Sequence, residues 1–158
     1  MDREKAIQKR LKLREEHERQ YRLNLIVDLT KFLDAQLIPY QIEFGNNVAE
    51  WIAENFPIQF SGIDWGNCAG SETIPFVEDD VRDRLIVEAI SNDLQVDDIV
   101  WIAWGNALRP IMSVRAEVVV LHPAKFADED LDMWIIQVEK GFCLECYHEG
   151  YVGYKRVS

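Results

Sequence analysis

The sequence predicts an α+β fold in which N-terminal helices pack on one face of a mostly antiparallel sheet formed by the C-terminal half. Residues 2–37 contain no Gly or Pro and carry apolar side chains at helical spacing in their second half, whereas the pattern after residue 97 is typical of strands. Helices followed by a run of strands are typical of α+β domains. We expect residues 1–158 to form one domain, because a chain of this length can bury its own core.

Three helical stretches are expected before residue 95, and the first, over residues 2–37, is one long helix or two consecutive helices. Residues 1–22 are mostly charged, so this part of the first helix is expected to project or to lie along the surface, while an apolar stripe from residue 23 onward indicates docking on the core. A short helix is expected over residues 46–56 and a third from residue 78, where carboxylates favour the helix dipole. A strand over residues 57–64 and a long loop over residues 65–77 are expected between them.

The second half of the chain is expected to consist of strands. Residues 99–104 are continuously apolar, which predicts a central strand covered on both sides. Residues 111–121 alternate between apolar and polar, which predicts one long strand. Residues 133–138 and 142–148 flank a glycine-containing turn and predict a hairpin, and residues 151–157 predict an edge strand.

Charge is distributed unevenly along the chain. Residues 32–81 contain nine carboxylates and no Lys or Arg. Residues 1–22 carry a net charge of +3, with eight basic and five acidic residues, and the other 136 residues carry −14, with nine basic and twenty-three acidic residues. An acidic body argues against direct binding of nucleic acid or of an anionic membrane, because both need clustered Lys and Arg. The charge favours a basic protein as the partner.

Composition predicts a cytoplasmic protein with free thiols. No apolar run approaches the length of a membrane span, and the N-terminal residues lack the apolar core of a signal peptide. Three cysteines, an odd number, are typical of a reducing compartment. The sequence does not indicate an oligomeric state.

Cys143, Cys146 and His148 form a C-x-x-C-x-H cluster that is similar to a zinc signature. Zinc needs four converging ligands, but alternation along a strand directs the two sulfurs to opposite faces. We therefore predict structural cysteines that hold no metal.

Asp128, Asp130, Asp132 and Glu139 match positions of a calcium-binding EF-hand loop. Met133 occupies the position where the sharp turn of that loop requires glycine, and a strand is expected to follow. A solvated acidic turn explains these residues, so we predict no metal and no cofactor.

The sequence contains none of the common catalytic motifs. The three histidines, His17, His122 and His148, are far apart in the chain, and no nucleophile elbow, Walker loop, dinucleotide fingerprint or H-E-x-x-H motif is present. We expect a binding protein rather than an enzyme. A small enzyme whose site is assembled from scattered Asp, His and Cys remains an alternative.

The acidic segment around residues 64–80 is the candidate contact surface, because aromatic residues beside carboxylates suit an interface that is anchored by burial and steered by charge. The candidate partner-binding residues are Asp64, Trp65, Glu72, Phe76, Glu78, Asp79 and Asp80. In the other interpretation, the two aromatic side chains cap the core and the acids are hydrated. The alternative contact surface is the outward face of the sheet, with Glu117, Glu139 and Glu145.

The segment 142–151, FCLECYHEGY, together with the plan of a small acidic α+β chain, resembles immunity proteins of bacterial contact-dependent growth-inhibition and other polymorphic toxin systems. The resemblance implies a protein that neutralises a cognate toxin, often a nuclease with a basic cleft. The acids would occupy or cover that cleft, and complementary charge would speed association. A DNA-mimicking phage or plasmid inhibitor would use the same acidic face against a different basic enzyme, and a subunit of an assembly would use the apolar stripe and the N-terminal helix.

Overall fold

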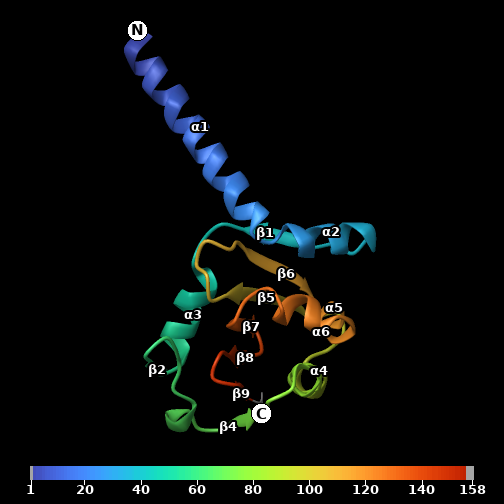
Figure 1. Ribbon diagram of the computed structural model, residues 1–158. Coiled ribbons are helices and arrows are strands. Elements are labelled where there is room, and N and C mark those ends of the chain that lie inside the picture. Colours follow the sequence, from blue (N-terminus) through green and yellow to red (C-terminus); the bar gives the residue numbers. More distant parts are fainter. Residues whose placement is uncertain (1, 156–158) are drawn as a thin grey trace.

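A computed structural model describes residues 2–155 and shows a seven-stranded sheet with helices around it (Figure 1). The strands are β1 (Gln41–Glu43), β4 (Ser71–Pro75), β5 (Ile99–Trp104), β6 (Ile111–Arg115), β7 (Met133–Gln137), β8 (Phe142–Tyr147) and β9 (Tyr151–Lys155). Their order is β1-β6-β5-β7-β8-β9-β4, and every neighbouring pair is antiparallel. The predicted α+β class is therefore confirmed. Strands β2 (Ile58–Gln59) and β3 (Gly62–Ile63) form a separate small hairpin.

The helices are α1 (Asp2–Asn24), α2 (Val27–Ala35), α3 (Asn47–Asn55), α4 (Asp79–Asp93), α5 (Ala116–Leu121) and α6 (Pro123–Ala127), with a 3-10 turn, η1 (Trp65–Asn67). The predicted first helix is thus two consecutive helices. Within residues 2–155, no helix combines the length and the apolar character that crossing a bilayer requires.

Helix α1 projects away from the sheet, and none of its residues is buried (Figure 1). Its C-terminal end is attached to the body through Arg22, whose guanidinium donates to the carbonyl oxygens of Leu108 (2.8 Å) and Ala107 (3.3 Å). Arg19 and Arg22 also lie over the ring of Phe44, 4.9 and 5.3 Å from its centroid. The rest of α1 is solvated, as its charge predicts.

Helices α2, α4, α5 and α6 cover one face of the sheet and form the main core with it. The largest buried side chains of this core include Ile26, Leu29, Leu33, Ile86, Ile90, Ile102, Met112, Phe126 and Ile135. Helix α4 begins where the sequence predicts, with Asp79 and Asp80 in its first turn.

The opposite face of the sheet is covered as well. Helix α3 packs Val48, Ile52 and Phe56 into a second apolar cluster, to which the sheet contributes Ile136 and Cys143. The β2–β3 hairpin and η1 belong to the same layer. We call α3, this hairpin and η1, residues 47–67, the covering layer. It is the part of the fold that positions the candidate site.

Residues 111–121 do not form the single strand that alternation predicts. Strand β6 ends at Arg115 and α5 begins at Ala116. The backbone N–H of Ala116 donates to the carbonyl of Asp98 (2.7 Å), and that of Glu117 donates to Val96 (3.1 Å), which ends the strand ladder and turns the chain. Helices α5 and α6 also correct the expectation that only strands follow residue 97.

Two further expectations are wrong in the middle of the chain. Residues 57–64 are not one strand but a hairpin that reverses between β2 and β3. Residues 65–77 are not an irregular loop, because they contain η1 and β4. Strand β4 pairs with β9, so β9 is an inner strand rather than the predicted edge. Residues 156 and 157 of that predicted strand lie outside the described residues.

Candidate protein-binding surface

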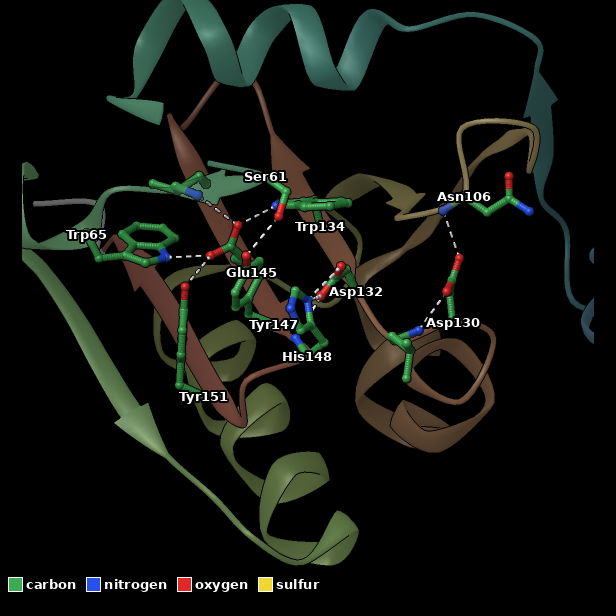
Figure 2. A network of polar contacts seen from close by, with 12 residues as sticks. Ser61, Trp65, Asn106, Asp130, Asp132, Trp134, Glu145, Tyr147, His148 and Tyr151 are labelled. Atoms are coloured by element: carbon green, nitrogen blue, oxygen red, sulfur yellow. Dashed lines mark hydrogen bonds and ion pairs between the residues drawn. The ribbon is translucent and has the colours of Figure 1, made fainter. Parts of the chain in front are cut away.

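Glu145 on β8 ties the covering layer to the sheet. Its side chain is 0% exposed, and its four hydrogen-bond partners are all neutral groups (Figure 2). Oε1 accepts from the indole of Trp65 (3.0 Å) and the hydroxyl of Tyr151 (3.1 Å). Oε2 accepts from the indole of Trp134 (2.7 Å) and the backbone N–H of Ile63 (3.0 Å). Four donors offset much of the cost of burying a carboxylate.

Burial changes the acidity of groups around this carboxylate. Desolvation raises the pKa of the Tyr151 hydroxyl, and the charge and hydrogen bond of Glu145 raise it further, so this hydroxyl stays a donor at neutral pH. Desolvation also raises the pKa of Cys143 well above its usual range and that of Cys146 to about 11. Both cysteines are therefore neutral thiols at physiological pH.

The two cysteines of β8 lie on opposite faces of the sheet, as the strand pattern predicts. Cys143 belongs to the cluster under the covering layer, and Cys146 belongs to the main core. His148 lies beyond the strand, where its Nδ1 is 2.9 Å from a carboxylate oxygen of Asp132. Across residues 2–155, no three His, Cys, Asp or Glu side chains converge as a metal site would require.

The β2–β3 hairpin is held firmly against β8 from its second turn residue, Ser61, onward. Ser61 Oγ lies 2.8 Å from the hydroxyl of Tyr147 (Figure 2). Gly62 lies so close to the same ring that an added Cβ would be 2.9 Å from it, which only glycine avoids. The next residue, Ile63, donates its backbone N–H to Glu145. The hairpin is therefore rigid where it meets the sheet.

Phe60, the first residue of the hairpin turn, is not held against the sheet in this way. Phe60 is 93% exposed and has a φ of 56°, and Ile58 beside it is 50% exposed. A left-handed φ at a hairpin turn favours Gly or Asn, because the Cβ of other residues is crowded there. A large aromatic residue at this position is strained and gains no burial from its own fold.

An apolar cavity of about 350 Å³ opens beside the hairpin, between α3 and the sheet. Its wall includes Val48, Ile52, Ile58, Ile63, Ile111 and Trp134. Arg109 reaches the wall, but its guanidinium is paired with Glu129 (2.9 Å) and Asp130 (3.3 Å). The cavity is in the size range of sites that hold a small molecule or a partner's side chain.

The charged side chains of the covering layer are all acidic. The cation-free segment 32–81 supplies the whole covering layer, in which Glu50 and Glu54 on α3 are exposed. Basic residues reach this region from other parts of the described chain. Arg109 lies in the cavity wall, Lys155 lies 5.9 Å from the centre of the Phe56 ring, and Arg19 and Arg22 of α1 lie over the ring of Phe44. Of the nine carboxylates of residues 32–81, Glu50, Glu54 and Asp64 lie in this layer, and the others lie on or beside α2, β1, β4 and α4.

The structure separates the partner-binding residues that the sequence predicts. Trp65 is 7% exposed and bonds to Glu145, and Phe76 packs against the main core, so both aromatic side chains cap the core. Glu72 accepts a hydrogen bond from the hydroxyl of Tyr154 (2.7 Å). These residues hold the fold together, whereas a contact surface needs exposed groups.

The predicted acids around Trp65 and α4 lie in two places. Asp64 accepts a hydrogen bond from the side chain of Asn67 (2.6 Å) at the edge of the covering layer. Glu78, Asp79 and Asp80 are exposed at the start of α4, which covers the other face of the sheet, and Asp79 lies 3.6 Å from Arg82. The fold therefore does not bring these acids together into one surface.

The alternative surface on the sheet needs a correction. Glu145 does not point to solvent, because α3 and η1 cover the face that the sequence suggests is open. Glu117 is half-buried and lies 3.2 Å from Arg115, and Glu139 is exposed in the β7–β8 turn. These two carboxylates remain at the surface on different elements.

The acids that match a calcium loop point to separate partners. Asp128 lies 2.7 Å from the Arg82 guanidinium, and Asp130 accepts from the backbone N–H of Asn106 (2.8 Å) (Figure 2). Burial acts to lower the pKa of Arg82, but its hydrogen bonds to Asp128 and Asp83 outweigh burial and raise it. These carboxylates serve the fold through ion pairs and turns.

Comparison with models of known protein families and with curated protein sequences finds no match for this chain. The features that distinguish its surface are an exposed aromatic residue on a rigid hairpin, an apolar cavity beside it and exposed carboxylates on α3. The sequence patterns do not single out Phe60, Glu50 or Glu54, although the absence of Lys and Arg from residues 32–81 points to this part of the chain.

Proposed function

We propose that this protein binds a basic protein partner through the covering layer and neutralises it, as do the toxin-immunity proteins that it resembles. One observation carries the proposal: residues 47–67, the middle of the segment without Lys or Arg, form a layer on one face of the sheet in which every charged side chain is a carboxylate. Exposed carboxylates and exposed apolar side chains occur together on that layer.

The two kinds of group have different roles in binding. Glu50 and Glu54 lie on the solvent side of α3 and attract a basic surface over a distance, which raises the association rate. Ile58, Phe60 and the cavity supply apolar area that loses water on contact, which holds the complex together. A basic partner such as a nuclease, whose substrate cleft attracts phosphate, has the complementary charge.

The test is isolation of binding proteins from source-cell extract on the immobilised full-length chain, with charge-reversed variants in parallel. Glu50→Lys with Glu54→Lys should reduce retention of a basic protein by about tenfold or more, because like charges at an interface repel. Asp79→Lys with Asp80→Lys, and Glu117→Lys with Glu139→Lys, are the matched controls and should retain it. Melting curves check that each variant folds.

Two results would contradict the proposal. One is that no basic protein is retained by the wild-type chain. The other is that the Glu50 and Glu54 variant retains the protein while one of the control variants loses it, which would assign the contact to that region. A retained protein that inactivates growing cells when it is expressed alone, and is harmless beside this chain, would identify the neutralised partner.

A further inference from the structure

We propose that Phe60 is the anchor of this interface and inserts into an apolar pocket of the basic partner whose rim carries Lys or Arg. The inference rests on the proposed function and adds the residue that carries the affinity and the kind of pocket that receives it. The partner is a folded protein, because an inserted aromatic ring needs a preformed pocket.

Phe60 buries very little of its side chain in its own fold. It is 93% exposed in a backbone conformation that large residues disfavour, at a turn position where glycine is free of strain. Side chains that a fold leaves both strained and exposed are candidates for function, because the fold alone gives no reason for them. Aromatic residues are the most frequent anchors of protein interfaces.

The same exposure and φ occur at a second residue whose surroundings differ. Leu37 is 90% exposed with a φ of 57°. Leu37 follows the C-terminal end of α2. There the backbone N–H groups of Leu37 and Ile38 donate to the carbonyls of Asp34 (3.1 Å) and Leu33 (2.9 Å). Helix α2 packs on the other face of the sheet from the covering layer. Leu37 is therefore a matched control for Phe60.

The hairpin presents Phe60 in a fixed position. Ser61 bonds to Tyr147, Gly62 rests on the same ring, and Ile63 bonds to the buried carboxylate of Glu145. The three residues that follow Phe60 are thus attached to β8. A rigid support lowers the entropy lost on binding, so the aromatic ring is available for contact without prior ordering.

The surroundings of Phe60 determine the chemistry of the partner. Ile58 widens the apolar tip, and the cavity lies on the α3 side of the hairpin. Glu50 and Glu54 are exposed on α3, and the covering layer contains no Lys or Arg. Complementarity then requires a partner that is apolar at the centre of the contact and basic around it.

The test uses the full-length chain and, as the probe, the basic protein purified after retention on the immobilised wild-type chain. The dissociation constant is measured by calorimetry for Phe60→Gly, Phe60→Tyr and Leu37→Gly, with a melting curve for each. Phe60→Gly should weaken binding by about 30-fold to 100-fold, the range of interface anchors. Phe60→Tyr should restore most of the affinity, and Leu37→Gly should bind as the wild type does.

Melting curves separate binding from folding, since Phe60→Gly removes strain and exposed apolar surface and should not lower the melting temperature. A Phe60→Gly chain that binds within about threefold of the wild type would overturn the anchor while leaving the proposed function intact. Retention of no basic protein would instead end the proposed function, and the anchor with it.

Discussion

Glu145 shows how a single side chain can organise a layer of the fold. Its carboxylate replaces water with two indole N–H groups, one hydroxyl and one backbone N–H, contributed by β3, η1, β7 and β9. Neutral donors satisfy the charge without a salt bridge, so the stabilisation depends on geometry more than on ionic strength. Glu145 is buried as the carboxylates of many active sites are, but both of its oxygens already accept hydrogen bonds from other parts of the fold.

Replacing Glu145 tests this role. Glu145→Gln keeps the shape but turns an NH₂ group toward donors, so we expect a loss of about 1–3 kcal/mol in the free energy of unfolding. Glu139→Gln, in the exposed turn of the same hairpin, should change it by less than about 0.5 kcal/mol. Urea denaturation measures both. Equal stability of the two variants would show that the buried network contributes little.

The sequence could not reveal Glu145 as buried, because alternation along β8 shows which residues share a face but not what covers that face. Cys143 and Tyr147, on the same side of the strand, were the available signal: apolar residues on both sides are typical of a strand covered twice. Phe60 was missed for a different reason. Phe60-Ser61 is not a usual turn pair, so the sequence predicts one strand over residues 57–64 where the hairpin lies.

At the scale of elements, the long periodic segments were predictable and the short ones were not. Helices α2, α3 and α4 and the β7–β8 hairpin lie where the sequence predicts them. Helix α5 was missed because residues 116–120 contain three valines, whose β-branched side chains favour strands, and the tertiary structure overrides that preference. Strand β4 was missed because it contains Pro75 and few apolar residues, and it exists through pairing with β9.

The contact between η1 and β9 depends on one glycine. An added Cβ at Gly153 would lie 2.3 Å from the indole nitrogen of Trp65. Gly153→Ala should therefore displace Trp65 from Glu145 and lower the free energy of unfolding by about 1–3 kcal/mol, the usual cost of overpacking. Gly66→Ala, within η1, meets only an ordinary contact at 3.5 Å and is the control.

Chemical denaturation and the NMR signal of the Trp65 indole N–H measure this effect. The signal should shift in Gly153→Ala and stay in place in Gly66→Ala. Unchanged stability together with an unchanged indole signal would contradict the packing of η1 on β9.

At the scale of the whole molecule, the charge of the chain is arranged by the fold. Residues 47–67, the covering layer, carry only acidic charged side chains on one face of the sheet, while α1, the most basic part of the chain, projects away from the sheet (Figure 1). The carboxylates of the covering layer add a local negative field to the solubility that the net charge of −11 supplies. A local negative field is what the proposed binding of a basic partner requires.

The measurement that tests this account most directly is the association rate of the purified partner with the full-length chain as a function of salt concentration. We expect the rate to fall by about tenfold or more from low to high salt, because screening shortens the reach of the exposed charges. Glu50→Lys with Glu54→Lys should lower the rate at low salt and flatten its salt dependence. A rate that stays constant across the salt range for the wild-type chain would contradict the central claim that a basic partner is attracted by the covering layer.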